Sequence, residues 1–306
     1  MRRLFVLILL VVVGCGGAAE VPPVEVAPTI ETGVAKFGQS EIYYELAGSG
    51  EPTIILLHGG MLDRRMWDEQ FELLAKTYRV LRYDASAHGD SVLPPDVYWD
   101  HADLRELMNR LEIDRAVLVG LSLGGKTAID LALENPERVE AIVAVSSGLS
   151  GYRFMAVSSG LSGYRFTSDF YLEQKDVMIQ AWKAGEFDVV VESFQRCWTD
   201  GPYRAPEDVD PEIREKVRSM ARNGLEHAME GRMIDPPAID RLGELELPML
   251  VVVGKLDMPG ILEIADMVVA ANPNAELVVV PDVAHMVNME APERFNELLL
   301  EYLSRF

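Results

Sequence analysis

The chain alternates between two kinds of segment, and this alternation limits its possible folds more than any other feature of the sequence. Short runs of β-branched and other apolar residues are predicted to be strands, at 42–44, 53–57, 78–83, 116–120, 139–145, 249–253 and 277–280. Segments with helical spacing of apolar residues lie between them, at 68–76, 102–111, 124–134, 261–271 and 292–303. This pattern predicts an α/β fold with a mostly parallel sheet and helices on both faces.

Between residues 145 and 248 the alternation stops. Residues 167–243 are polar, have helical spacing and contain few large apolar side chains. Because this helical stretch interrupts a sheet, we predict that it is an inserted lid, at about 148–243. Trp182 and Trp198 are predicted to line a substrate pocket under this lid.

One segment of the chain is duplicated. Residues 144–154, AVSSGLSGYRF, recur identically at 156–166, with Met155 between the copies. Two copies of so short a unit cannot form a solenoid, so we interpret the repeat as a recent duplication or an artefact of sequence assembly. The first copy is predicted to finish the strand that ends at Val145, and the second to lengthen the loop that enters the lid.

The composition is that of a globular protein and disfavours several function classes. The 306 residues are 49% hydrophobic and 25% charged, which disfavours a disordered or multi-span membrane protein. The net charge of −21 disfavours a nucleic-acid partner, because phosphate neutralisation needs clustered Lys and Arg. The two cysteines, Cys15 and Cys197, cannot build a disulfide framework or a cysteine-based zinc site. No metal-ligand spacing or phosphate-binding loop occurs, so we predict no metal and no cofactor.

The first residues are predicted to be a targeting signal. Two arginines precede an apolar run, 4–13, that is too short to span a bilayer. Residues 12–15, VVGC, resemble a bacterial lipobox, in which the cysteine is lipidated and becomes the mature N-terminus. We therefore predict a lipoprotein signal peptide at 1–14 and lipidation of Cys15. The alternative is a generic signal peptide with an incidental cysteine.

The segment after this signal is predicted to be a flexible tether, at 15–33. Residues 16–33 contain three prolines, three glutamates and no aromatic residue. Gly16 after the cysteine resembles the pattern of lipoproteins that reach the outer membrane. We expect the body, 34–306, to be held in the bacterial cell envelope, on the periplasmic side of the outer membrane, with the lipid anchor as its only membrane contact.

A G-x-S-x-G motif at 120–124 is the strongest chemical signal in the chain. It directly follows the apolar run 116–119 and begins a helical segment. A sharp strand-to-helix turn needs glycines, because side chains there would clash, and it raises the serine hydroxyl above the sheet. We predict that Ser122 is a catalytic nucleophile rather than a structural loop serine.

Two further residues complete a predicted catalytic triad. Asp257 and His285 each follow a predicted strand, so both are expected at the carboxyl edge of the sheet. The order Ser122, Asp257, His285 matches the chain order of one triad architecture. A neutral imidazole takes the proton of the serine, and the carboxylate sets the tautomer of that imidazole. The alternative for Asp257 is a solvated loop residue.

The turn at 58–60, HGG, ends an earlier apolar strand. A glycine turn there can direct a backbone N–H at a substrate carbonyl oxygen, opposite the N–H of Leu123. We predict an oxyanion hole formed by Gly60 and Leu123, with Met61 as the alternate donor. His58 is predicted to form structural hydrogen bonds rather than to act as a base.

Taken jointly, these motifs resemble the α/β-hydrolase family, in its lid-bearing branch of esterases, lactonases and related enzymes. The matching segments are 58–60, Trp67, 120–124, 254–257 and 284–295. The resemblance covers 34–306 and implies an eight-stranded, mostly parallel sheet with an inserted helical lid. One segment departs from it: the family's D-x-R-G-x-G-x-S stretch appears at 84–91 as DASAHGDS, without the arginine and the first glycine.

The resemblance also implies a reaction. A serine hydrolase of this branch would cleave a small carboxylic ester or lactone through an acyl-enzyme. Other reactions of the same triad stay open: amide, thioester or carbon–carbon bond hydrolysis, acyl transfer and perhydrolysis. A different class, a lipoprotein that binds a ligand without turnover, is also open.

Overall fold

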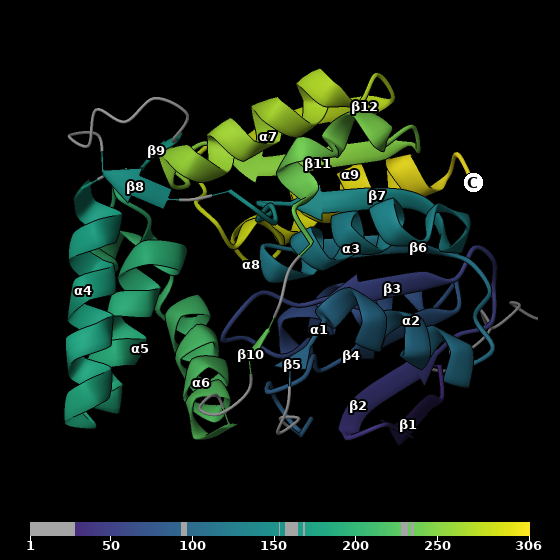
Figure 1. The fold of residues 1–306 in the computed structure, drawn as a ribbon, viewed down its shortest axis with the longest axis horizontal. Helices are drawn as coiled ribbons and strands as arrows, with labels where there is room; N and C mark the ends of the chain where they lie inside the picture. The colour runs from purple at the N-terminus through teal and green to yellow at the C-terminus, as the bar shows by residue number, and fades with distance from the viewer. Residues whose placement is uncertain are drawn as a thin grey trace, which may run out of the picture.

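The structure is a computed structural model that describes residues 28–92, 97–152, 154–156, 165–167, 169–227, 232–233 and 236–306. One sheet dominates it, with the strand order β1-β2-β4-β3-β6-β7-β11-β12 (Figure 1). Its strands are β1 (Ile30–Phe37), β2 (Ser40–Ala47), β3 (Ile54–Leu57), β4 (Val80–Tyr83), β6 (Ala116–Leu121), β7 (Val139–Val145), β11 (Met249–Gly254) and β12 (Ala275–Val280). The pairs formed by β1 with β2 and by β2 with β4 are antiparallel and the other pairs are parallel, so the prediction of an eight-stranded, mostly parallel sheet is confirmed.

Helices cover both faces of this sheet, as predicted. They are α1 (Asp68–Leu74), α2 (Asp100–Arg110), α3 (Leu123–Glu134), α7 (Pro259–Ala271), α8 (Val287–Glu290) and α9 (Pro292–Leu303). Apolar residues of α2, α3 and α7 share one buried cluster, whereas those of α1, α8 and α9 share the other. Strands β3, β6 and β11 are buried along their whole length between the two layers. Being covered on both faces explains why their sequences are continuous apolar runs.

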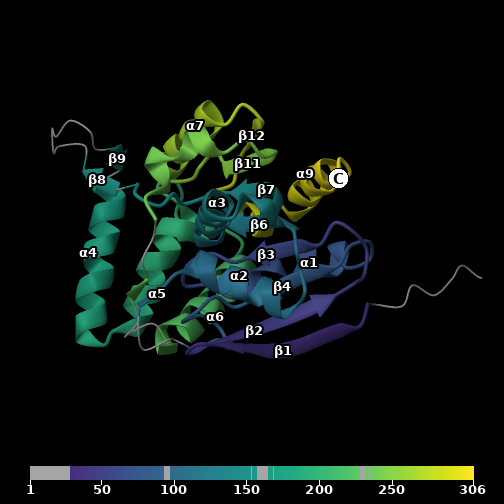
Figure 2. The ribbon, with the colours of Figure 1, turned by 45° about the vertical axis from the view of Figure 1, so that its right-hand side comes forward.

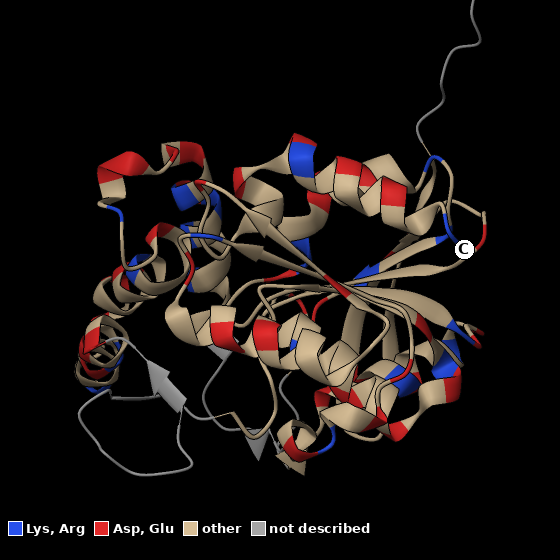
Figure 3. Ribbon diagram, turned by 90° about the horizontal axis from the view of Figure 1, so that it is seen from above, with Lys and Arg blue, Asp and Glu red and all other residues tan. Residues whose placement is uncertain are grey.

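Few charged residues lie on the central strands. Figure 3 shows most Lys, Arg, Asp and Glu segments on helices and loops, with the central strands largely without charge. Among the described residues, none of the helices has the length and apolar character needed to cross a membrane.

The N-terminal edge of the sheet corrects one prediction. Strand β1 begins at Ile30, so residues 30–33 belong to the sheet, and the extension of the tether to residue 33 is wrong. Gly33 lies opposite Tyr44 in the β1–β2 hairpin, where a Cβ on residue 33 would lie 2.5 Å from the hydroxyl oxygen of the tyrosine. Most side chains of β1 are exposed, so the strand lacks the apolar run that would have revealed it. The predicted signal peptide, Cys15 and the rest of the tether up to residue 27 lie outside the described residues.

In the described part of the interval between β7 and β11 lie three α-helices, which confirms the inserted helical segment. They are α4 (Asp169–Ala184), α5 (Phe187–Gln195) and α6 (Pro211–His227), with a π-helical turn, Arg196–Asp200, following α5. Figures 1 and 2 show the three helices together on one side of the molecule, beyond one end of the parallel strands. This end carries the loops that follow β6 and β11.

The duplicated segment enters this insertion. Its first copy finishes β7 at Val145, as predicted. The described parts of the later residues are two short strands, β8 (Phe154–Ala156) and β9 (Arg165–Thr167), which pair with each other in parallel and not with the main sheet. The remainder of the second copy lies outside the described residues.

Deleting Met155–Phe166 tests whether the second copy is needed for folding. We expect a melting temperature within a few degrees of the wild type, because the eight-stranded sheet keeps all of its strands and because closing a shorter loop changes the chain entropy little. Thermal unfolding followed by circular dichroism gives the result. A large drop in melting temperature would show that the second copy packs in the body.

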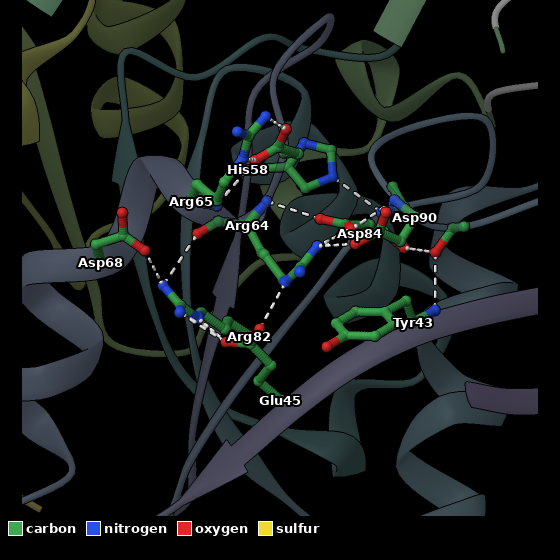
Figure 4. A network of polar contacts seen from close by, with 12 residues as sticks. Tyr43, Glu45, His58, Arg64, Arg65, Asp68, Arg82, Asp84 and Asp90 are labelled. Carbon is green, nitrogen blue, oxygen red and sulfur yellow. Dashed lines mark hydrogen bonds and ion pairs between the residues drawn. The ribbon is translucent and has the colours of Figure 1, made fainter. Parts of the chain in front are cut away.

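Arg64 forms ion pairs with two carboxylates of the segment 84–91, the one that departs from the family pattern. Its guanidinium lies 2.5 Å from Asp84, 2.8 Å from Glu45 and 3.0 Å from Asp90 (Figure 4). The Arg64 side chain is only 12% exposed and Asp84 is fully buried, so the pair compensates a charge that would otherwise be buried alone. Arg64, which precedes α1, thus pairs with the carboxylate of Asp84. Asp84 is the first residue of the stretch 84–91, in which the arginine of the family pattern is missing.

Candidate active site

Ser122 lies at the turn between β6 and α3, as predicted. Its backbone has φ 55° and ψ −108°, a strained conformation for a residue with a side chain, and its side chain is half-buried. A methyl group on Gly120 would lie 2.3 Å from the carbonyl carbon of Gly124, and one on Gly124 would lie 2.2 Å from the carbonyl oxygen of Leu57. The two glycines therefore permit the close strand-to-helix turn that positions the serine.

Asp257 and His285 form a buried hydrogen-bonded pair. The imidazole Nδ1 lies 2.9 Å from Oδ2 and 3.1 Å from Oδ1 of the carboxylate. The side chain of His285 is 2% exposed and that of Asp257 is 0% exposed. The backbone N–H of Met258 donates a further hydrogen bond of 2.7 Å to Oδ1 of Asp257. Nδ1–H donation to the carboxylate leaves Nε2 as the ring nitrogen that can accept a proton.

The sheet explains why these two residues meet although they are 28 positions apart. Strands β11 and β12 are parallel neighbours, with Gly254 opposite Val280. Asp257 and His285 follow these strands, so their loops leave the same edge of the sheet. A Cβ on Gly254 would lie 1.9 Å from the carbonyl oxygen of Ala284, so the glycine allows the loops to come this close. Strand β7 separates β11 from β6, which carries Ser122 at its carboxyl end.

The predicted oxyanion donors lie in two adjacent backbone segments. A Cβ on Gly60 would be 3.9 Å from Cβ of Leu123, so the turn after β3 faces the start of α3. Within the described part of the chain, the N–H groups of Gly60 and Met61 donate no hydrogen bond. Leu123 is the first residue of α3, where a backbone N–H has no partner within the helix. These three N–H groups are available to a ligand oxygen.

His58 holds the turn that carries Gly60. Its Nδ1 contacts the carbonyl oxygen of Gly59 at 2.8 Å, and its Nε2 accepts a hydrogen bond of 2.8 Å from the N–H of Ala85. Both ring nitrogens are therefore used by the backbone, which confirms the structural interpretation. Burial, with the nearby ring of His88 contributing, lowers the pKa of His58 to about 3.

This neutral histidine predicts a loss of stability in acid. An unfolded His58 takes up a proton below about pH 6.5, whereas the folded residue stays neutral down to about pH 3. Because the unfolded chain binds more protons in this window, the free energy of unfolding should fall as the pH is lowered through it. In urea titrations, His58→Gln should lose this component, while His101→Gln, on α2, should keep it. An unchanged pH dependence in His58→Gln would contradict the assignment.

The two predicted pocket tryptophans have different positions. The ring of Trp198, in the π-helical turn, lies 4.7 Å from the ring of His285. The ring of Trp182, in α4, packs 5.5 Å from Phe187 at the start of α5. The ring contacts of the described residues thus bring Trp198, and not Trp182, to the imidazole.

Inserted helices contribute two further contacts that sequence analysis missed. Tyr171, near the start of α4, packs edge-on against Trp198 at 5.7 Å. Gly224, in α6, approaches the oxyanion turn so closely that a Cβ there would lie 3.5 Å from the carbonyl oxygen of Met61. No local pattern reveals such contacts, because they depend on how the inserted helices are placed over the sheet. Among the described residues, no group of three or more His, Cys, Asp or Glu side chains is arranged to hold a metal ion.

Comparison with known proteins places the chain among hydrolases. A model described as the alpha/beta hydrolase family matches residues 54–298. The 2-hydroxy-6-oxononadienedioate/2-hydroxy-6-oxononatrienedioate hydrolase of Paraburkholderia xenovorans is 25% identical over 284 residues, covering 87% of this chain and 92% of the relative.

Two solved structures cover similar shares. A thermophilic esterase from Thermogutta terrifontis has a TM-score of 0.68 and 26% identity, over 90% of this chain and 98% of the esterase. Est816, an N-acyl homoserine lactone degrading enzyme, has a TM-score of 0.69 and 25% identity, over 88% and 100% of the two chains.

Proposed function

The chain belongs to the alpha/beta hydrolase family, and on this premise we propose that it is a serine hydrolase of small carboxylic esters or lactones, with Ser122, His285 and Asp257 as its catalytic triad. The observation that carries the proposal is the buried pair of His285 and Asp257, since a carboxylate on Nδ1 prepares Nε2 to accept a proton. The strained turn at Ser122 belongs to the same sheet edge.

The reaction proceeds in two halves. Oγ of Ser122 attacks the carbonyl carbon of the substrate while Nε2 of His285 takes the proton of the serine hydroxyl. The carbonyl oxygen becomes negatively charged and accepts hydrogen bonds from the N–H groups of Leu123 and of Gly60 or Met61. His285 then returns the proton to the leaving alkoxide oxygen, and the acyl-enzyme remains. His285 then takes a proton from water, whose oxygen attacks the acyl carbon. As the bond between that carbon and Oγ of Ser122 breaks and the acid is released, His285 returns the proton to Oγ. Asp257 orients the imidazole throughout and stabilises its charged form.

The charges around this site favour an uncharged substrate. The inserted segment 196–214 contains three arginines, and each is paired with a carboxylate: Arg196 with Asp200, Arg204 with Glu290, and Arg214 with Glu192 and Asp200. A dicarboxylate substrate, of the kind named for the Paraburkholderia xenovorans relative, needs cations that are not already neutralised. The aromatic ring of Trp198 beside the imidazole suits an uncharged group. N-acyl homoserine lactone, the compound that Est816 degrades, is uncharged and agrees with this preference.

Labelling with a fluorophosphonate tests the nucleophile. Its phosphorus bonds to an activated serine oxygen and fluoride leaves, so wild type should be labelled and Ser122→Ala should not. Ser147→Ala is the matched control, because Ser147 is a buried serine beside the same turn, and it should keep the label. Absence of label on folded wild type would favour a lipoprotein that binds a ligand without turnover.

A substrate panel then separates the reactions. Short p-nitrophenyl esters and simple lactones should be cleaved faster than amides, thioesters and 2-hydroxy-6-oxodienoate compounds at equal concentration. Preferential cleavage of a carbon–carbon bond, or acyl transfer or perhydrolysis in place of hydrolysis, would overturn the ester and lactone assignment while leaving the triad in place.

We also propose that Cys15 carries a lipid that anchors this hydrolase in the bacterial cell envelope. Wild-type protein should incorporate labelled palmitate and sediment with membranes, whereas Cys15→Ser should do neither. Acyl chains contribute ~0.8 kcal/mol per buried methylene, so several chains on one cysteine hold a protein firmly. Release of wild type into the soluble fraction without detergent would contradict the proposal.

A further inference from the structure

We propose that Arg204 and Glu290 are a positioning pair, through which the inserted helical segment holds the loop of His285 in its reactive place. The inference rests on the proposed function, because it assigns these two residues a task in that same reaction. The two residues come from separate segments of the chain. Arg204 follows the π-helical turn, and Glu290 ends α8.

Glu290 connects directly to the histidine loop. Its Oε1 accepts a hydrogen bond of 3.1 Å from the backbone N–H of Ala284, the residue before His285. Its Oε2 lies 2.6 Å from Nη1 of Arg204. The two side chains are 5% and 12% exposed, so this is a contact of the interior rather than a surface ion pair. A carboxylate with these two partners fixes the backbone next to the imidazole.

Arg204 is itself held rigidly on the other side. Its Nε donates to the carbonyl oxygen of Asp200 and its Nη2 to that of Thr199, both at 2.8 Å. Its own carbonyl oxygen accepts a hydrogen bond of 3.1 Å from Arg196, which also pairs with the Asp200 carboxylate at 2.7 Å. The guanidinium therefore joins the end of the π-helical turn to Glu290 without freedom to move.

The backbone between the turn and Arg204 touches both catalytic loops. A Cβ on Gly201 would lie 2.6 Å from the carbonyl oxygen of Leu256 and 3.0 Å from Cβ of Ala284. These residues precede Asp257 and His285, respectively. Gly201 has φ 75° and ψ 173°, a conformation that is essentially restricted to glycine. The segment thus lies against both loops, and the ring of Trp198 from the same turn packs against the imidazole.

These contacts define what the pair does. Trp198 and Gly201 limit the movement of the imidazole and the loops in one direction, while Glu290 holds the backbone of Ala284 from the side of α8. Displacing a reacting group by about 1 Å lowers a rate about 100-fold. Loss of the pair is therefore expected to slow the chemical step more than it weakens substrate binding.

Two variants test the proposal, each compared with a matched control. Arg204→Met removes the cation, and Glu290→Gln keeps the shape and an oxygen for Ala284 while removing the charge. The control, Arg222→Met, breaks an exposed pair with Asp188 between α5 and α6 of the same insertion. With a p-nitrophenyl ester, we expect kcat to fall about 10- to 100-fold in both variants, with KM within about threefold of wild type, and no such change in the control.

The rate of fluorophosphonate labelling should fall by a similar factor, since it requires the same activation of Ser122. Because the two residues act as one unit, the double variant Arg204→Met/Glu290→Gln should lose no more activity than the less active of the two single variants. If Arg204→Met does not fold by circular dichroism, Glu290→Gln decides alone. Unlabelled wild type would refute the proposed function; labelled wild type with unchanged rates in the folded variants would refute the positioning pair only. A rise in KM at constant kcat would also refute it.

Discussion

Ser122→Ala is expected to lower kcat/KM for the preferred ester by ~10³-fold or more, leaving only the rate that binding and oxyanion stabilisation provide. His285→Ala should have a comparable effect, since without the imidazole the hydroxyl keeps its proton and is a weak nucleophile. The double variant should be no worse than either single variant, because nucleophile and base act as one unit. Initial rates of ester hydrolysis at saturating and limiting substrate measure these effects.

The same experiment has a clear contrary result. Strictly additive losses in the double variant would mean that Ser122 and His285 do not cooperate. Retention of full activity in Ser122→Ala would refute the serine-hydrolase proposal. Ser147→Ala serves again as the control, since the change is the same and Ser147 is next to the turn without being part of the proposed machinery.

Asp257→Asn is expected to lower kcat by about 10²-fold or more, yet by less than Ser122→Ala does. The carboxylate accepts the Nδ1–H of His285 and the N–H of Met258 in a site without solvent exposure. An amide in its place has one acceptor oxygen and a donor group, so it permits the wrong imidazole tautomer and cannot stabilise the imidazolium. The nucleophile, the base and the oxyanion donors all remain.

The pH profile provides a second measurement for this variant. Asp257→Asn should lower the plateau of the kcat/KM profile relative to that of wild type. Full activity of Asp257→Asn beside an inactive Ser122→Ala would show that another group orients the imidazole. Ser146 and Ser147 follow β7, so the end of this strand, next to β6, offers no replacement carboxylate.

Several parts of the fold follow from local properties of the chain. Buried parallel strands require continuous apolar runs, so β3, β6, β7 and β11 were identified correctly from residue type alone. Strand β1 was missed, because it is a mostly exposed edge strand and its sequence resembles a linker. Strand β1 forms because its backbone pairs with β2 in a hairpin, and its own residue types do not indicate this pairing.

The same division applies to the site. Glycines at 120 and 124 have to be there because a Cβ at either position would meet the backbone at 2.3 and 2.2 Å, so the turn at Ser122 could be predicted from a short motif. Asp257 and His285 could be paired because each follows a strand and parallel strands end at the same edge. These inferences need only the short glycine motif and the order of the strands along the chain.

By itself, the sequence determined the buried strands of the sheet, the turn at Ser122 and the order of the three predicted catalytic residues, because backbone sterics and strand burial impose local residue patterns. Only the tertiary structure decided which tryptophan reaches His285, that Arg64 pairs with Asp84, and that Arg204 contacts Glu290. Each of these contacts joins residues from separate elements, and its geometry depends on how the helices pack over the sheet. Contacts between side chains that are far apart in the sequence produce no local residue pattern, so the sequence alone does not predict them.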